Sequence, residues 1–116
     1  MKAAPDDFLP LKPTAFHVLL SLSDGELHGY GLVQDIAART GGRTLLDPGN
    51  LYKSLRAMLD DGLIEESERR EVEGRGDERR RYYRITPLGR KVANAEAWRL
   101  QALVGEARSR KLMKPR

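Results

Sequence analysis

The sequence of 116 residues contains no cysteine. This excludes disulfide bonds, thiol catalysis and zinc sites with cysteine ligands. It also lacks any apolar run approaching the ~18 residues of a membrane span, and its first residues lack the apolar core of a signal peptide. We therefore expect a cytoplasmic protein without membrane contact.

Histidine is scarce as well, since His17 and His28 are the only two. No carboxylate cluster accompanies them, so the sequence predicts no metal site. No nucleophile stands beside a base, and no carboxylate pair exceeds what charged surface helices produce. We therefore expect neither an enzyme nor a bound cofactor.

Basic residues outnumber acidic ones, with 21 Lys and Arg against 17 Asp and Glu, giving a formal net charge of +4. The excess lies after Pro87, whereas the segment around residues 65 to 80 is rich in both signs. The balance is compatible with a polyanionic partner but does not identify one. The length indicates a single small domain, in which a large apolar surface on one element would need a second chain to cover it.

The stretch from residue 47 to residue 65 predicts one short helix with both ends marked. Asp47 can cap the first free N–H groups, Pro48 fits the first position, and Gly62 favours termination, so the helix should run from about Pro48 to Asp61. One stripe at i, i+4, i+7 and i+8 must be buried: Leu51, Leu55, Met58 and Leu59.

The opposite face of this helix carries hydrogen-bond donors, two cations and an aromatic: Asn50, Tyr52, Lys53, Arg56 and Ala57. In isolation, such a face would only meet water. Here the helix is followed by Leu63 and Ile64, a charged segment with two glycines, and a strand-like run from Arg79 to Thr86. This is the order of a winged helix-turn-helix, in which the helix enters the DNA major groove and the hairpin reaches the neighbouring backbone or minor groove.

The remaining elements complete an α+β, mainly α, fold with a wing of two or three strands. Residues 1 to 10 form an arm, residues 11 to 86 the winged helix-turn-helix domain, and residues 87 to 112 a long C-terminal helix. The first helix begins at Pro13 and is apolar around most of its circumference, with Phe16 at an interface. The second helix opens at His28 and ends near Thr40.

Three finer expectations concern the backbone. The glycines at 29 and 31 should permit close helix packing, because the full glycine fingerprint of a phosphate-binding loop is missing. Residues 43 to 46 should form a brief strand that pairs with the wing. The wing strands should span residues 63 to 70 and 79 to 85, with Tyr83 and Ile85 as the buried pair.

The C-terminal helix starts at Thr86-Pro87 and, at about 1.5 Å per residue, would reach roughly 36 Å, longer than so small a domain can cover. Ala93, Ala97, Leu100, Val104 and Ala107 follow the spacing of a helix-on-helix seam, which favours a homodimer. Trp98 flanks the seam as an interface anchor or, alternatively, as a stacking platform for a flat ligand between subunits. The predicted interface residues are Phe16, Ala97, Trp98, Leu100, Val104 and Ala107.

Three motifs carry a family resemblance: residues 28 to 31 (HGYG), residues 49 to 64 (GNLYxxL leading to DGLI) and residues 80 to 89 (RRYYRITPxG). In this order they resemble the PadR family of bacterial winged-helix transcriptional regulators, in its short form with a single C-terminal helix, over residues 11 to 105. The resemblance implies a dimer that represses promoters at inverted repeats and releases DNA on a small-molecule or stress signal. The sequence shows no signature for the effector pocket.

By position, the resemblance places Asn50, Tyr52 and Lys53 where the third helix meets DNA, and Arg75, Arg79 and Arg80 in the wing. Many relatives have threonine or serine at the position of Asn50, and asparagine can make a bidentate contact to adenine. The leading hypothesis is a sequence-specific DNA-binding repressor that contacts double-stranded DNA through these six residues and Arg56. The alternative is a winged-helix module that binds other proteins without specific DNA binding.

Overall fold

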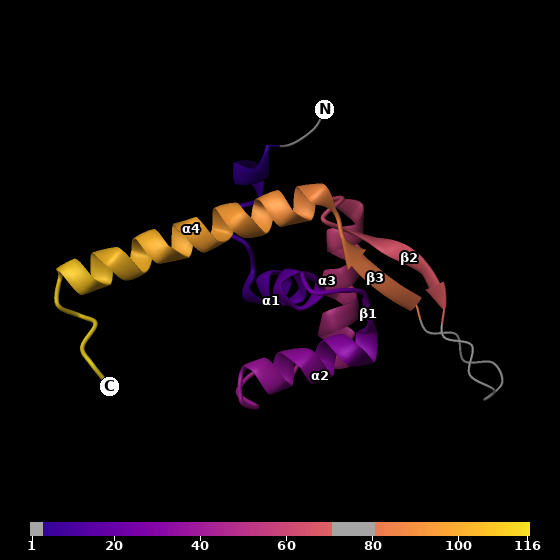
Figure 1. Ribbon diagram of the computed structural model, residues 1–116, viewed down its shortest axis with the longest axis horizontal. Helices are drawn as coiled ribbons and strands as arrows, with labels where there is room; N and C mark the ends of the chain where they lie inside the picture. The colour runs from indigo at the N-terminus through magenta and orange to yellow at the C-terminus, as the bar shows by residue number, and fades with distance from the viewer. Residues whose placement is uncertain (1–3, 71–80) are drawn as a thin grey trace.

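The computed structural model describes residues 4–70 and 81–116. Its elements, in chain order, are the 3-10 helix η1 (Pro5–Phe8), α1 (Pro13–Leu22), β1 (Leu27–His28), α2 (Gly29–Arg39), α3 (Pro48–Asp60), β2 (Ile64–Arg70), β3 (Arg81–Ile85) and α4 (Pro87–Ser109) (Figure 1). Three short helices and a small sheet form the body, and α4 extends away from it. This confirms the predicted mainly helical winged helix-turn-helix fold. None of the described helices is long and apolar enough to cross a membrane.

The sheet is antiparallel and has the order β1-β3-β2. Its third strand is Leu27–His28, which pairs with β3, so the prediction that residues 43 to 46 supply this strand is wrong. The physical reason lies at the end of α2. The backbone N–H groups of Arg43 and Thr44 donate to Thr40 instead, to its carbonyl and hydroxyl oxygens respectively.

The core lies where α1, α2 and α3 meet the sheet and the first half of α4. Its buried members are Val18, Leu19, Leu22, Leu32, Ile36, Leu51, Leu55, Met58, Leu63, Ile64, Tyr83 and Val92. Three of the four residues in the predicted stripe of α3 are therefore fully buried, and Leu59 packs at the edge of the core. Burying this stripe turns the opposite face of α3 outward.

The predicted buried pair on β3 is partly wrong. Tyr82 and Tyr83 are both buried, at 7% and 5% exposure, whereas Ile85 is half-buried. Tyr83 belongs to the core on one face of β3, and Tyr82 packs against His28 on the other. On the face expected to be polar, the Tyr82 ring meets the edge of the His28 ring, with centroids 5.1 Å apart.

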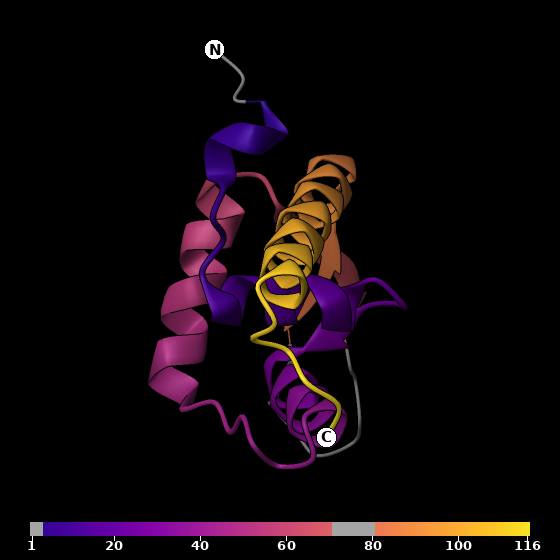
Figure 2. The ribbon, with the colours of Figure 1, turned by 90° about the vertical axis from the view of Figure 1, so that its left-hand side faces the viewer.

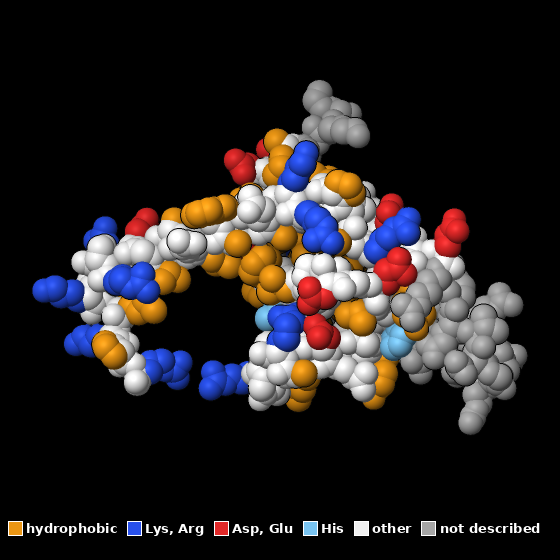
Figure 3. Space-filling view, in the orientation of Figure 1, with side chains coloured by type: hydrophobic (Ala, Val, Ile, Leu, Met, Phe, Trp, Pro, Cys, Tyr) orange, Lys and Arg blue, Asp and Glu red, His pale blue; other side chains and the backbone are white. Residues whose placement is uncertain are grey.

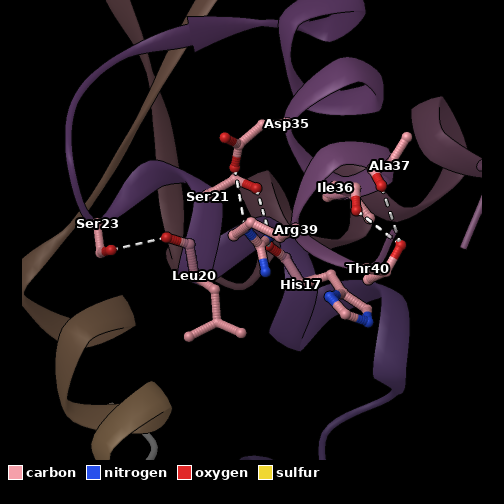
Figure 4. A network of polar contacts seen from close by, with 9 residues as sticks. All are labelled: His17, Leu20, Ser21, Ser23, Asp35, Ile36, Ala37, Arg39 and Thr40. Atoms are coloured by element: carbon pink, nitrogen blue, oxygen red, sulfur yellow. Dashed lines mark hydrogen bonds and ion pairs between the residues drawn. The ribbon is translucent and has the colours of Figure 1, made fainter. Parts of the chain in front are cut away.

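Arg39 joins α1 to α2 through a polar cluster (Figure 4). Its guanidinium donates to the carbonyl oxygen of His17 at 3.0 Å, to Oγ of Ser21 at 2.6 Å and to the carboxylate of Asp35 at 3.0 Å. The hydrogen bond from Ser21, and then that from Arg39, lower the pKa of Asp35. The cluster therefore links α1 to α2 through side-chain hydrogen bonds.

The start of α4 is locked to the base of the wing. The Thr86 hydroxyl accepts the N–H of Gly89 at 2.9 Å, which confirms the predicted cap, and donates to the carbonyl oxygen of Gly62 at 2.6 Å. At Gly89 the helix passes so close to the backbone of Leu63 that a Cβ would collide with its carbonyl oxygen. This contact sets the direction in which α4 leaves the body.

The N-terminal segment packs on the same half of α4. η1 contacts α4, and the segment then descends between α3 and α4 to reach α1 (Figure 2). Phe8 and Leu9 pack against the chain's own core. The carboxylate of Glu96, only 2% exposed, accepts hydrogen bonds from Arg99 and from the N–H of Leu11, and these lower its pKa. Glu96 thus ties the expected arm to the domain.

Candidate nucleic-acid interface

Both ends of α3 are stabilised as its local sequence predicts. The Asp47 side chain accepts the N–H of Asn50 at 3.2 Å, and Pro48 occupies the first position of the helix. At the other end, Gly62 has φ 79°, in the left-handed region that glycine adopts most readily. The predicted span of Pro48 to Asp61 is therefore correct to within one residue.

The outward face of α3 carries the predicted contact residues Asn50, Tyr52, Lys53 and Arg56, all of which are exposed. Within the described part of the chain, neither Lys53 nor Arg56 forms an ion pair. The two cations are therefore available to an external anion. The face can attract a polyanion with its guanidinium and ammonium groups and can offer amide and phenol groups for directional hydrogen bonds.

Tyr52 leans on the start of α2. A Cβ on residue 29 would lie 2.9 Å from the Tyr52 hydroxyl oxygen, so only glycine accommodates the ring in this position. The expectation that this glycine permits close helix packing is confirmed. The Tyr52 side chain remains 56% exposed and is held from one side only.

Two hollows flank α3 and divide its predicted residues. A cleft of about 720 Å³ between α2, α3 and the sheet includes Tyr52 and Arg56 in its walls. A second hollow of about 730 Å³, between α3, α1 and the N-terminal segment, includes Asn50 and Lys53. The outward ridge of α3 therefore separates two concave regions.

Tyr30 was not among the predicted contact residues. It lies in the first turn of α2, is 59% exposed and lines the same cleft as Tyr52 and Arg56. The signal in the sequence was an aromatic residue in the first turn of the second helix, between Gly29 and Gly31.

Carboxylates neutralise the described arginines of the wing. Arg84 donates a hydrogen bond to the carboxylate of Glu65 at 2.7 Å and lies 3.8 Å from Glu26, and the bond to Glu65 raises the pKa of Arg84. Arg81 lies 3.4 Å from Glu66. The base of the wing is thus electrically mixed. The predicted wing contacts Arg75, Arg79 and Arg80 lie outside the described residues.

The face of the molecule in Figure 3 shows a similar mixture of charges over the body. Acidic and basic side chains are interspersed over the body, whereas the far end of α4 and the residues after it carry mainly basic side chains. Hydrophobic side chains gather in the hollow beneath α4.

The second half of α4 extends beyond the body of the domain and exposes large apolar side chains. Of the predicted interface residues, Ala97, Trp98 and Val104 are exposed, and Phe16, Leu100 and Ala107 are half-buried. Trp98 is 63% exposed, and two further large apolar residues, Leu20 and Leu103, are also exposed. Ala93 packs against the chain's own core, so the uncovered seam begins at Ala97.

Comparison with known proteins gives consistent matches. The Transcriptional regulator PadR-like family matches residues 18–95. Transcriptional regulator Rv3488 of Mycobacterium tuberculosis is 40% identical over 90 residues, which cover 78% of each chain. A transcriptional regulator from Clostridium thermocellum superposes with a TM-score of 0.65 at 27% identity, covering 80% of this chain and 86% of the other. Bacillus subtilis PadR, solved in complex with operator DNA, gives a TM-score of 0.64 at 22% identity, covering 74% of this chain and 47% of that one.

Proposed function

The chain belongs to the PadR-like family of transcriptional regulators, and from this premise we propose that it is a homodimeric, sequence-specific DNA-binding repressor. The family consists of transcriptional regulators, not enzymes, in agreement with the expectation from the sequence. One structural neighbour binds operator DNA. We propose that this chain also binds operator DNA, and we assign the residues that contact it.

The observation that carries the proposal is the outward face of α3, where two exposed cations lie beside an exposed amide and phenol. Lys53 and Arg56 would contact phosphates, a contribution that is independent of sequence and weakened by salt. Asn50 and Tyr52 would contact base edges in the major groove, where an asparagine can pair with N6 and N7 of adenine.

The dimer is supported by the uncovered half of α4 and the outer face of α1. An isolated chain would leave Trp98, Leu103 and Val104 in water, which argues for a second copy against them. A two-fold dimer would present two α3 helices to an inverted repeat, with half-sites about 34 Å apart or a multiple of that spacing.

Trp98 also connects the dimer to regulation. A flat small molecule stacked on this ring between the subunits would change their relative position and so the spacing of the two α3 helices. We assign release from DNA to such an effector, whose chemical identity is unknown.

Two substitutions on α3 and a control on α4 test the proposal that α3 contacts DNA. Lys53→Ala should weaken binding to every duplex and reduce the slope of log affinity against log salt by about 1. Asn50→Ala should instead relax the preference at particular base pairs, by about 1–3 kcal/mol at each. Lys91→Ala removes an equally exposed lysine from α4 and should change neither quantity. If the Lys53 and Asn50 variants both bind and discriminate as the wild type does, α3 is not the reading helix.

A further inference from the structure

His28 lies where three elements of the proposed DNA-facing surface meet. It is the last residue of β1, it caps the start of α2, and it lines the same cleft as Tyr52 and Arg56 of α3. Through β1 it is also paired in register with Tyr82 on the central strand. A change in the charge or position of the His28 ring therefore affects α2, α3 and the sheet.

The contacts of the ring fix its position. Nδ1 accepts the N–H of Gly31 at 2.9 Å. A Cβ on residue 31 would lie 3.4 Å from Cε1 and 3.5 Å from Nδ1, so the ring lies directly against the first turn of α2. On its other side the ring meets Tyr82 at an interplanar angle of 74°. The two glycines of the HGYG motif thus have separate roles: one accommodates Tyr52 and the other the His28 ring.

This cap requires one protonation state. An imidazole nitrogen accepts a hydrogen bond only when it carries no proton, so the capping ring must be neutral, with its proton on Nε2. The imidazolium ion carries protons on both nitrogens and cannot accept the N–H of Gly31. Its positive charge at the start of a helix is also opposed by the helix dipole.

We propose that His28 is a positioning residue for duplex binding, which holds α2, α3 and the sheet in the binding geometry only as the neutral imidazole. The proposal rests on the proposed function, since it concerns the same DNA-facing surface. Acidification releases the cap, loosens the start of α2 beside Tyr30 and Tyr52, and adds positive charge that favours any duplex. Specificity for the operator therefore falls even where total DNA binding does not.

Within the described part of the chain, charged and titratable groups from α2, α3 and the sheet surround the ring. The titratable groups in the walls of the cleft are Tyr30 on α2, Tyr52, Arg56 and Asp60 on α3, Glu66 on β2, and Arg81 and Tyr83 on β3, and Tyr82 packs on the ring itself. Ordinary carboxyl groups titrate near pH 4 and tyrosines near pH 10, whereas imidazole titrates near about 6.5. The two pH values 7.8 and 5.8 bracket the ordinary value of an imidazole and lie between those of carboxyl groups and tyrosines.

The test compares the wild type with His28→Asn at these two pH values. Asparagine is a strong helix cap and does not titrate. In thermal denaturation, the unfolding equilibrium constant of the wild type should rise about threefold relative to that of the variant between pH 7.8 and 5.8, because only part of the roughly fivefold effect of one helix cap is lost over this range. His28→Asp, a second cap that stays ionised over this range, should match the asparagine variant. His17→Asn removes the other histidine of the chain, and the difference in pH dependence between proteins with and without His28 should persist in that background.

The second readout is the ratio of affinities for a duplex enriched by selection and a scrambled duplex. This ratio should fall about twofold in the wild type, since about half of the molecules keep the cap at pH 5.8, and it should stay constant in His28→Asn. The same dependence on pH in wild type and variant, in either readout, overturns the proposal. If the wild type prefers no duplex even at pH 7.8, the proposed function itself has failed, and the thermal comparison alone then decides whether neutral His28 caps α2.

Discussion

Replacing Gly89 by alanine should separate α4 from the base of the wing. The added methyl group would collide with the carbonyl oxygen of Leu63 and lie 2.9 Å from Cγ1 of Ile85. Overpacking typically costs about 1–3 kcal/mol, and here one obstacle is a backbone atom that cannot rotate away, so we expect about 3 kcal/mol. With an unfolding entropy of about 2.1 cal/mol/K per residue over this chain, that loss lowers Tm by about 12 °C.

Gly105 in the same helix supplies the matched control. Apart from its chain neighbours and its own helix backbone, no described atom lies within 4 Å of the position that its Cβ would take. At a protein concentration where the chain is monomeric, Gly105→Ala should therefore show only the higher helix propensity of alanine, a gain of up to about 1 kcal/mol. Thermal denaturation followed by circular dichroism measures both variants in one buffer. Equal shifts of Tm in the two variants, or an unchanged Tm in Gly89→Ala, would refute the reasoning.

Two further substitutions test contacts that position the candidate interface. Gly29→Ala should displace the exposed Tyr52 ring at a stability cost below about 0.5 kcal/mol and yet alter duplex preference; an unaltered preference in a selection assay would mean that Tyr52 does not meet the duplex. Glu96→Gln should cost about 1–2 kcal/mol at pH 7, measured by urea denaturation, because Arg99 and the N–H of Leu11 lose a carboxylate acceptor. Since these contacts lower the pKa of Glu96, its contribution is present above the ordinary carboxyl range near pH 4 and is lost as pH falls through the lowered value. The stabilities of wild type and variant should therefore converge in acid, and a constant difference down to pH 2 would contradict this account.

Helix α3 could be predicted because its determinants are local. A cap at Asp47, a stop at Gly62 and the period of the stripe containing Leu51 and Leu55 all lie within sixteen consecutive positions. The same reasoning defined the face opposite the stripe. Once one side of a helix is buried, the direction of every other side chain follows from the helical repeat.

Pairing between distant segments could not be predicted in this way. β1 has only two residues, too few to show a period, and it is a strand only because Tyr82 and Tyr83 lie opposite to it. The burial of Tyr82 has the same origin, since its cover comes from His28, far away in the sequence. The short apolar run at residues 43 to 46 suggested a strand, but hydrogen bonds to Thr40 engage its first two N–H groups.

The site was predictable in part for the same reason. Helical periodicity identified Asn50 and Lys53 as outward-facing, but it could not show that Tyr52 leans on Gly29 or that Tyr30 shares its cleft. Both contacts join separate elements. The pairing of the described wing arginines with carboxylates is likewise a cross-strand arrangement, set by the register of β2 and β3.

The most direct test of the central claim is selection of bound duplexes from a random library, followed by affinity measurements on the recovered sequences across a salt series. The account predicts enrichment of an inverted repeat with half-site centres about 34 Å apart or a multiple of that spacing, and affinity that falls steeply with salt. Weak binding without an enriched sequence would contradict it. The basic face of α3 would then be a source of non-specific charge, and the protein-interaction alternative would take precedence.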